Sequence, residues 1–544
     1  MPDEPSWPTV DGDDTNHEPP TVQVRRPDPP TVRIPAPVPA ERRPPAPGPA
    51  APPPATPARP AGEIENEIKS EPEPVPEPIT ESEGEAPPAR RRKRPFLIAA
   101  AVLLVLALAG TAVVGAQRGW FDRTPAATTA AAAPPAPVTL AVKGVGTGGT
   151  RPTPAGVGAV LAGPTANELL APLTGTVVDP ASGQVLWNQG ETTPATPAST
   201  TKVLVAAAAL LALDHTAQLS TKVVKGAEPG TVVLVGGGDP TLSPLPAGQA
   251  TVYPGAPTLD DLAAQVRAAG PVTRVLYDAT RYTGPGLAPG WAPADVPDGY
   301  VSPIQPLMLA GGRSDPTKGD VRRTETPAAD TATALAQRLG VTSVAAGAAP
   351  ENAEVLGEVE SVPVDQLVEN MMQLSDNVLG ETLSREVAIA RGAEPSFAGG
   401  AQAVRDVLTE NGFDLTGATF VDGSGLSPNN KLPSRLLADI VAAAAGPDTA
   451  DPKTAELRPL LTALPVAGGS GTLAGRFTEQ GAGGRGWVRA KTGTLTGVNS
   501  LAGVVLDTDG RLLVFAFMSL SDDDTTRVRG ALDQVAAALR TCGC

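Results

Sequence analysis

Histidine and cysteine are almost absent from this chain of 544 residues, which contains two of each. A zinc hydrolase that ligates its metal through imidazole needs more than His17 and His215. A Ser-His-Asp triad would depend on His215, but no nucleophile-elbow motif accompanies it, and a place at a helix end suits this residue better. The Cys542-Gly543-Cys544 end is no disulfide framework and predicts a loose tail without a role. We expect neither a metal nor a cofactor.

Aromatic side chains and positive charge are also scarce. Aromatic residues make up 3% of the chain, and the net charge of −16 argues against nucleic acid as a general partner. Proline, by contrast, is abundant, and much of it lies in residues 1–94, which have mixed charge and few large apolar side chains. Such a segment cannot offset its ordering entropy, so we predict a disordered tail.

Within this tail the sequence Pro-Thr-Val recurs at residues 8–10, 20–22 and 30–32. Two interpretations stay open for the repeat. It is either a phospho-acceptor or docking motif for a cytoplasmic partner, or Pro-rich low complexity without a role, which we favour.

A basic cluster from Arg90 to Arg94 precedes an uncharged apolar run that ends near Ala116. The run has about 20 residues, the length of one membrane-spanning helix, so we predict an anchor at 95–117. The positive-inside rule then leaves residues 1–94 in the cytoplasm and the rest of the chain outside. A cleaved signal peptide is the competing interpretation, but the long leader favours a single-pass anchor. Residues 118–164, rich in Ala, Pro, Gly and Thr, are expected to form a linker.

The first chemical motif is Ser199-Thr200-Thr201-Lys202, which leads into the apolar run 203–213. Because Pro197 disfavours an earlier start, a helix is expected to begin near Ser199, with Ser199 and Lys202 on one face. The run is too short to cross a bilayer and predicts a helix buried on all sides. Taken alone, the motif fits equally well an N-cap serine followed by a lysine that reaches solvent.

Apolar alternation predicts strands near both ends of the globular part, which is expected to begin at residue 165. Hairpins are predicted from 173–178 with 184–187 and from 501–506 with 512–517, and a further strand at 487–494. Helices are predicted at 366–374, 378–390, 436–445 and 525–539, and a short strand from Phe420 into a Gly-rich turn. These distant segments must assemble into a mostly antiparallel sheet flanked by helices. We predict an α+β fold.

Residues 221–360 have a different character and are expected to form an inserted subdomain of mixed structure. Strands are predicted at 231–235 and 275–277, and helices at 259–269 and 331–339. The insertion would divide the catalytic domain into two parts, at 165–220 and 361–544. The triglycine at 236–238 precedes Asp239-Pro240, which prevents a helix start and favours a tight turn over a phosphate-binding loop.

Two further motifs follow the insertion. Lys491-Thr492-Gly493 is the one Lys-Thr-Gly of the chain. Ser-x-Asn occurs as Ser375-Asp376-Asn377 and as Ser427-Pro428-Asn429. We favour the first of these, because it interrupts a helical stretch and would present a hydroxyl and an amide at the lip of a cleft; a turn suffices to explain the second.

These three motifs in this order resemble the serine acyltransferases that recognise penicillin. The resemblance is close to the low-molecular-mass class C penicillin-binding proteins, which are D-alanyl-D-alanine carboxypeptidases and endopeptidases with a large insertion. It rests also on the sequences at 197–202, 234–240, 421–426, 464–468 and 471–473. It covers about 170–540 and implies a β-lactamase/transpeptidase-like fold.

The resemblance and the residue types together suggest an acyl-enzyme on Ser199. Lys202 is the candidate base, provided that burial and the second cation Lys491 lower its pKa. Ser375 would pass a proton to the leaving amine, and Asn377 would hold the peptide carbonyl of the substrate and contact Lys202.

Substrate binding is assigned to the Lys-Thr-Gly strand. Lys491, Thr492, Gly493 and Thr494 would bind the terminal carboxylate that marks a C-terminal D-alanine. By resemblance, the oxyanion hole consists of the backbone N–H groups of Ser199 and Thr494.

The expected function is therefore that of an extracytoplasmic, membrane-anchored carboxypeptidase that trims peptidoglycan stem peptides ending in D-Ala-D-Ala and is acylated by β-lactam antibiotics. Three alternatives stay open, one of which is a structural anchor that uses the Pro-rich tail as a cytoplasmic docking arm. A β-lactamase would need a group that activates water, and no glutamate in the sequence stands out for this role. A non-catalytic penicillin sensor or cell-wall-binding module would be acylated by penicillin without releasing D-alanine.

Overall fold

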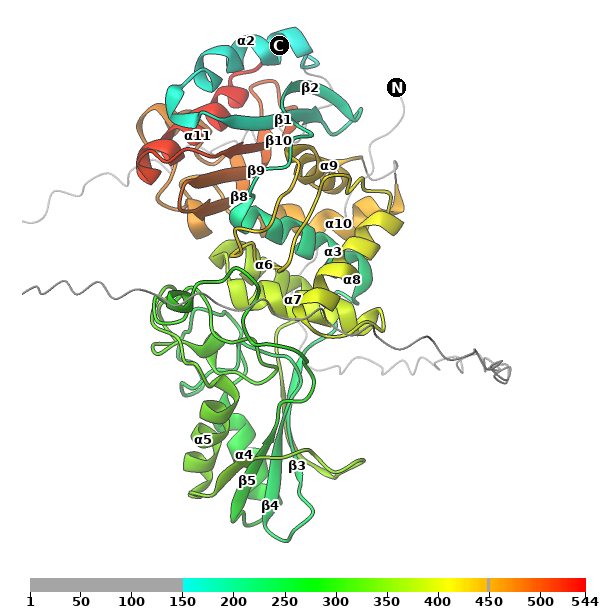
Figure 1. Cartoon of the computed structure of the whole chain (residues 1–544), viewed down its shortest axis with the longest axis vertical. Helices are drawn as coiled ribbons and strands as arrows, with labels where there is room; N and C mark the ends of the chain where they lie inside the picture. The colour runs from blue at the N-terminus through cyan, green and yellow to red at the C-terminus, as the bar shows by residue number, and fades with distance from the viewer. Residues whose placement is uncertain (1–149, 448–450) are drawn as a thin grey trace, which may run out of the picture. The chain divides into compact units, whose positions relative to one another are not determined.

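The computed structural model describes residues 150–447 and 451–544 (Figure 1). The predicted tail at 1–94, the predicted anchor at 95–117 and most of the predicted linker lie outside these residues. Within the described part, no helix has both the length and the apolar character needed to cross a membrane.

One sheet joins the two ends of the described chain. Its strand order is β2-β1-β10-β9-β8, and every pair of neighbours is antiparallel. The strands are β1 (Leu173–Asp179), β2 (Gln184–Gln189), β8 (Val488–Leu495), β9 (Val498–Leu506) and β10 (Leu512–Ser519). The antiparallel sheet predicted from distant segments is thereby confirmed, and β8, which carries the Lys-Thr-Gly motif, is at its edge.

Helices cover both faces of this sheet, because alternate residues of each strand point to opposite sides. On β10, Phe515 and Phe517 belong to the core beneath α2 (Pro154–Thr165) and α11 (Thr525–Arg540). Val514 and Ala516 belong to the larger core on the other side, which holds α3 (Lys202–Ala212) and α9 (Ser434–Ala445). In Figure 1, α2 and α11 lie on one side of the sheet and α3, α9 and α10 (Pro452–Ala463) on the other.

Helix α2 shows that the predicted linker boundary at residue 164 is too late. Thr153 caps this helix by accepting a hydrogen bond from Gly156 N, and Pro154 stands at its first turn, where the missing N–H costs nothing. Val157 and Leu161 are fully buried against α11. The Ala- and Gly-rich composition suggested a spacer, but two large apolar residues one turn apart are enough to dock the helix.

The chain end is also better ordered than expected. Cys542 is fully buried and forms a disulfide with Cys544, whose carbonyl accepts a hydrogen bond from Thr153 N. The expectation of a loose tail was wrong, because the end of α11 packs on the start of α2.

The inserted segment forms a second sheet with the strand order β6-β5-β4-β3-β7. Its strands are β3 (Ser220–Lys225), β4 (Thr231–Gly236), β5 (Arg274–Asp278), β6 (Val344–Ala346) and β7 (Val355–Glu360). Strand β3 pairs antiparallel with β4 and β7, whereas β4, β5 and β6 are parallel. Ser361 N donates to Leu219 O, so the chain leaves the insertion beside the point where it enters.

Two helices pack on this second sheet. Helix α4 (Leu259–Ala269) agrees with the predicted bounds, and α5 (Pro327–Leu339) begins at Pro327 rather than at Thr331. Their buried residues, among them Leu262, Val266 and Leu335, form a separate core with Val223 and Val232 of the sheet.

The helices between the two sheets carry the interruption that the sequence predicted. Helix α6 (Val364–Leu374) ends before Ser375, α7 (Asn377–Ala390) begins directly after Asp376, and α8 (Phe397–Glu410) follows. The strand expected from Phe420 was wrong: this segment makes one isolated bridge, between Thr419 and Lys431, and otherwise turns.

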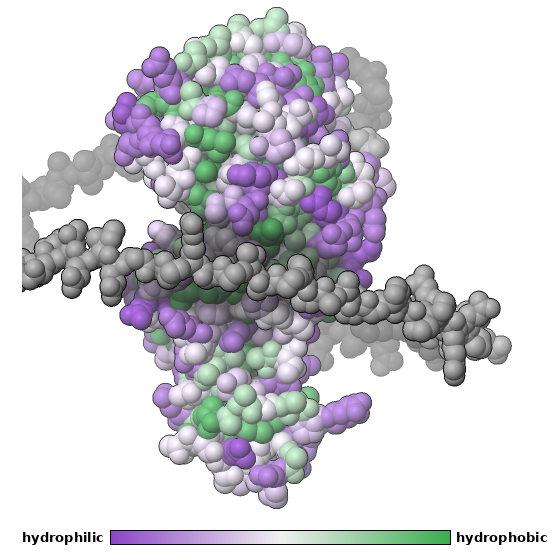
Figure 2. All heavy atoms as spheres, viewed as in Figure 1, coloured by the Kyte–Doolittle hydropathy of each residue, from purple (hydrophilic) through white to green (hydrophobic). Residues whose placement is uncertain are grey.

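The visible face of the described chain mixes hydrophilic and hydrophobic residues (Figure 2). Few large apolar side chains are exposed in the described residues, and two of them, Tyr300 and Leu374, line the cleft described below.

Candidate active site

Ser199 and Lys202 stand at the start of the buried helix, as predicted. A 3₁₀ turn (Ala198–Thr201) precedes α3, so Ser199 lies on the turn and Lys202 begins the α-helix. Lys202 Nζ is fully buried and lies 3.0 Å from Ser199 Oγ. Since Ser199 is half-buried and lines a cavity, it combines access to substrate with an amine at hydrogen-bonding distance.

The interruption between α6 and α7 supplies two more polar groups. Ser375 adopts a left-handed backbone conformation (φ 56°) that ends α6. Asn377 Oδ1 accepts a hydrogen bond of 2.6 Å from Lys202 Nζ, and Ser375 Oγ accepts one of 2.7 Å from Lys491 Nζ. This one loop therefore contacts both lysines.

Strand β8 approaches the nucleophile very closely, and Gly493 makes this possible. A Cβ atom on Gly493 would lie 2.5 Å from the carbonyl oxygen of Pro197 and 3.0 Å from the backbone nitrogen of Ser199. Any side chain here would force the strand away. The glycine thus brings the neighbouring Thr494 to the same side of the cavity as Ser199.

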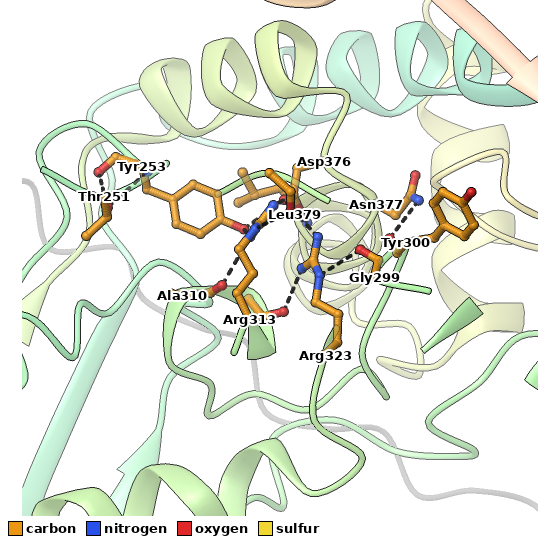
Figure 3. Close-up of polar contacts among 12 residues, drawn as sticks. Thr251, Tyr253, Gly299, Tyr300, Ala310, Arg313, Arg323, Asp376, Asn377 and Leu379 are labelled. Atoms are coloured by element: carbon orange, nitrogen blue, oxygen red, sulfur yellow. Dashed lines mark hydrogen bonds and ion pairs between the residues drawn. The ribbon is translucent and has the colours of Figure 1, made fainter. Parts of the chain in front are cut away.

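Asp376 anchors the loop through its buried carboxylate, whose contacts Figure 3 shows. Its Oδ1 caps α7 by accepting from Leu379 N, and its Oδ2 accepts 2.7 Å and 2.8 Å hydrogen bonds from Arg313 Nη2 and Tyr253 Oη. Arg323 Nη2 lies 3.9 Å from the same oxygen. Burial opposes ionisation, but Arg313 and Arg323 hold the pKa of Asp376 below its ordinary value.

This network ties the insertion to the loop that carries Ser375 and Asn377. Tyr253, Arg313 and Arg323 all come from the inserted segment, and Tyr300 O accepts a hydrogen bond of 2.9 Å from Asn377 Nδ2 (Figure 3). The insertion therefore fixes the orientation of the amide that faces Lys202.

Both lysines have pKa values below the ordinary 10.5. Burial lowers the pKa of Lys202 to about 8, although the nearby carboxylates Asp422, Asp376 and Glu381 oppose the shift. Burial and the charge of Lys202 lower the pKa of Lys491. Each charge disfavours the other, so the predicted role of Lys491 in lowering the pKa of Lys202 stays a prediction.

Behind Lys202 lies a buried turn that sequence reasoning left without a role. Ser424 O accepts a hydrogen bond of 2.6 Å from Lys202 Nζ, and Glu381 Oε1 accepts from the backbone N–H groups of Gly423 and Ser424. Burial and the charge of Asp422 raise the pKa of Glu381 to about 7. The carboxylate fixes the carbonyl that holds Lys202.

The second Ser-x-Asn motif, Ser427-Pro428-Asn429, forms hydrogen bonds with Asp422 and Pro289. Ser427 Oγ donates to Pro289 O, and its N–H donates to Asp422. Asp422 also accepts from Trp291 Nε1 and Asn430 Nδ2. These bonds are those of a turn, in agreement with the interpretation favoured from sequence.

A cavity of about 660 Å³ opens in front of Ser199. Its lining comes from the catalytic domain and from the insertion, and includes Ser199, Asp295, Tyr300, Asp320, Leu374, Ser375, Asn377, Leu426, Thr472, Arg476, Thr492, Thr494, Leu495, Thr496, Thr525 and Arg529. A peptide end in this space would therefore meet hydroxyl, amide, carboxylate and guanidinium groups.

The amino-acid sequence is similar to those of known carboxypeptidases. The model of the D-Ala-D-Ala carboxypeptidase 3 (S13) family matches residues 160–320 and 314–539. A carboxypeptidase of Mycobacterium tuberculosis is 44% identical over 469 residues, which are 84% of this chain and 99% of that protein. The chain belongs to the D-Ala-D-Ala carboxypeptidase 3 (S13) family. The expected class, a serine-type D-Ala-D-Ala carboxypeptidase, is confirmed.

One more distant relative and two solved structures are also similar to this chain. A D-alanyl-D-alanine carboxypeptidase of an Actinomadura species is 29% identical over 427 residues, 62% of this chain and 75% of its own. The crystal structure of penicillin binding protein 4 from Haemophilus influenzae has a TM-score of 0.57 at 22% identity, covering 71% of this chain and 98% of its own. That protein complexed with a β-lactam gives a TM-score of 0.51 at 23% identity, covering 70% and 98%. These two structures show that the fold is shared.

In this S13 carboxypeptidase the structure brings together the side chains of Ser199, Lys202, Ser375, Asn377 and Lys491, with Thr492, Gly493 and Thr494 on the adjoining strand. Sequence reasoning missed Glu381, Asp422 and Arg529. The turn 421–426 was noted as similar to the family but given no chemistry. Nothing in the sequence marks Arg529, because only the packing of α11 places it at the cavity.

Proposed function

We propose that this S13 carboxypeptidase removes the terminal D-alanine from peptidoglycan stem peptides through an acyl-enzyme on Ser199. The observation that carries the proposal is the buried amine of Lys202 at 3.0 Å from Ser199 Oγ. Its pKa of about 8 leaves roughly a tenth of the amine neutral at pH 7, and only the neutral amine accepts a proton.

In the first step, neutral Lys202 takes the hydroxyl proton as Ser199 Oγ attacks the carbonyl carbon before the last D-alanine. We assign the stabilisation of the negative charge that develops on the carbonyl oxygen to the backbone N–H groups of Ser199 and Thr494. The close approach of β8 at Gly493 supports this assignment, since it brings the backbone of the Lys-Thr-Gly strand next to that of Ser199.

The second step needs a proton on the leaving amine. Ser375 Oγ, which lines the cavity, is placed to donate its hydroxyl proton and to recover one from the ammonium of Lys491, which is hydrogen-bonded to it. Asn377 binds the peptide carbonyl of the substrate while its Oδ1 holds Lys202 in place. Water then hydrolyses the ester and restores Ser199.

A β-lactam carries a strained amide and a carboxylate in the same relation as the substrate, and we propose that it acylates Ser199. The fold shared with a protein solved in complex with a β-lactam supports this. Endopeptidase action on cross-links needs the same chemistry with a longer leaving group, and we propose it as a second activity.

We further propose that residues 95–117 anchor the enzyme as a single-pass membrane protein, with residues 1–94 in the cytoplasm and available to a partner, and the catalytic domain outside. The basic cluster before the apolar run supports this orientation. Protease treatment of intact cells should then digest the catalytic domain and spare a tag at residue 1; loss of the tag instead would reverse the orientation.

The function is tested by intact-protein mass spectrometry of the purified full chain in detergent after benzylpenicillin is added, beside Ser199→Ala. A long-lived adduct on the wild type alone, together with D-alanine release from a pentapeptide, is the expected result. An adduct that vanishes within seconds while the drug is hydrolysed would indicate a β-lactamase. An adduct without D-alanine release would indicate a sensor, and no adduct on a folded chain would refute the site.

A further inference from the structure

The cavity contains a surplus of positive charge next to Thr494. Arg476 and Arg529 both line it, but Asp533 is engaged by Arg476, which donates to it through Nε (2.9 Å) and Nη2 (2.7 Å). Arg529 Nε lies 3.3 Å from Thr494 Oγ1. Among residues 150–447 and 451–544, no carboxylate lies within 4.0 Å of the Arg529 guanidinium. Asp533 is thus hydrogen-bonded to Arg476 and acts on Arg529 only through its charge.

Lys491, which sequence reasoning placed among the residues that bind the terminal carboxylate, is buried and does not line the cavity. Its ammonium is fully buried and donates to Ser375 Oγ (2.7 Å) and Thr492 O (2.8 Å). It is not part of the cavity lining. The anion of a substrate would need another cation, placed nearer to the open side of β8.

We propose that Arg529 binds the terminal carboxylate of the substrate, together with the hydroxyl groups of Thr492 and Thr494. This inference rests on the proposed function and deepens it, because it names the group that distinguishes a free C-terminus from an internal peptide. A guanidinium offers parallel N–H groups whose geometry matches a carboxylate, which a single ammonium does not.

The surroundings of Arg529 favour an incoming anion. The side chain is half-buried, and burial together with the charge of Arg476 lowers its pKa. A carboxylate bound here would relieve the repulsion between the two guanidinium groups. Arg529 is held by its hydrogen bond to Thr494 and by the backbone of α11, whose carbonyl at this residue accepts from Arg476 Nη2 at 3.1 Å. The group is thus oriented before substrate arrives.

The test compares two acylating agents that differ only in the carboxylate: benzylpenicillin and its methyl ester. Acylation rates of the full chain are measured for the wild type, Arg529→Gln and Arg529→Lys. Arg527→Gln is the matched control, because Arg527 lies on the same helix and its exposed side chain pairs with Asp523. We expect Arg529→Gln to lose about 10- to 100-fold with the free acid and little with the ester, as removal of a charged hydrogen bond predicts.

Three further results complete the test. Arg529→Lys should recover part of the loss, and with a D-alanyl-D-alanine peptide Arg529→Gln should raise KM more than it lowers kcat. Equal losses with acid and ester, or no loss with either, would overturn the inference while a wild-type adduct leaves the proposed function standing. If the wild type reacts with neither agent and releases no D-alanine, the proposed function falls and this inference with it.

Discussion

The lysines of the cleft and those of the inserted sheet have opposite surroundings. Lys202 and Lys491 are fully buried and, within the described residues, their ammonium groups bind neutral oxygens. Lys222 on β3 is 40% exposed and pairs with Glu358 at 3.0 Å. In the described part of the chain, lysine thus has no direct counter-ion in the cleft, whereas Lys222 on the inserted sheet has one.

The difference shows how one residue type serves chemistry in one place and surface charge in another. Lys222 contacts water and forms an exposed ion pair with Glu358. In the cleft, burial penalises the charge and brings the pKa of Lys202 to about 8, where the amine can accept a proton. The exposed pair of Lys222 and Glu358 should contribute little to the free energy of unfolding. The buried amine of Lys202, by contrast, should largely determine the rate of acylation.

The largest expected effect is that of Lys202→Met. Without a base beside Ser199, acylation by benzylpenicillin should slow by about 10²- to 10⁴-fold, the range for loss of general base catalysis. Stopped-flow or mass-spectrometric acylation rates measure this, and a thermal melt checks that the variant folds. A variant that keeps more than a tenth of the wild-type rate would show that Lys202 is not the base.

Asp376→Asn tests the buried charges that join the two regions. The substitution leaves Arg313 and Arg323 buried without their carboxylate, so the free energy of unfolding should fall by about 3–5 kcal/mol. Urea unfolding measures this. Asp315→Asn is the control, because it breaks an exposed ion pair with Lys318 in the inserted segment that also carries Arg313 and Arg323. Equal effects of the two substitutions would contradict the buried network.

The pH dependence of the acylation rate tests the lowered pKa of the buried Lys202. Because the ammonium of Lys202 must lose its proton before it acts as a base, the acylation rate should rise with pH and level off above about 8. Glu381 is one of the carboxylates that raise the pKa of Lys202. Glu381→Gln should therefore move the midpoint to lower pH, by roughly one unit or less. An unchanged midpoint, or one moved to higher pH, would exclude this coupling.

The smallest expected effect is that of Lys222→Gln. Removal of this exposed pair should change the free energy of unfolding by less than about 1 kcal/mol, and less still in high salt. Acylation rates should match the wild type. A loss of several kcal/mol, measured by the same urea titration, would mean that the outer sheet depends on its ion pairs.

The sequence predicted the elements whose pattern is local. Alternating apolar residues marked β9 and β10, and the periodic face of α4 gave its bounds. Prediction from the sequence failed at two places. Helix α2 lies in a stretch with the composition of a linker. The segment after Phe420 has residues that favour a strand but forms a turn. In both cases tertiary contacts decided the outcome, because short segments have weak intrinsic preferences.

By itself, the sequence determined the chemical groups and their order along the chain: a serine and a lysine one helical turn apart, then Ser-x-Asn, then Lys-Thr-Gly. Only the tertiary structure decided which of them meet. It brings Asn377 to Lys202 across 175 positions, buries Lys491 outside the cavity lining and places Arg529 in that lining. The physical reason is that burial and distance set the pKa values and charges of these groups, and both arise only when distant segments pack together.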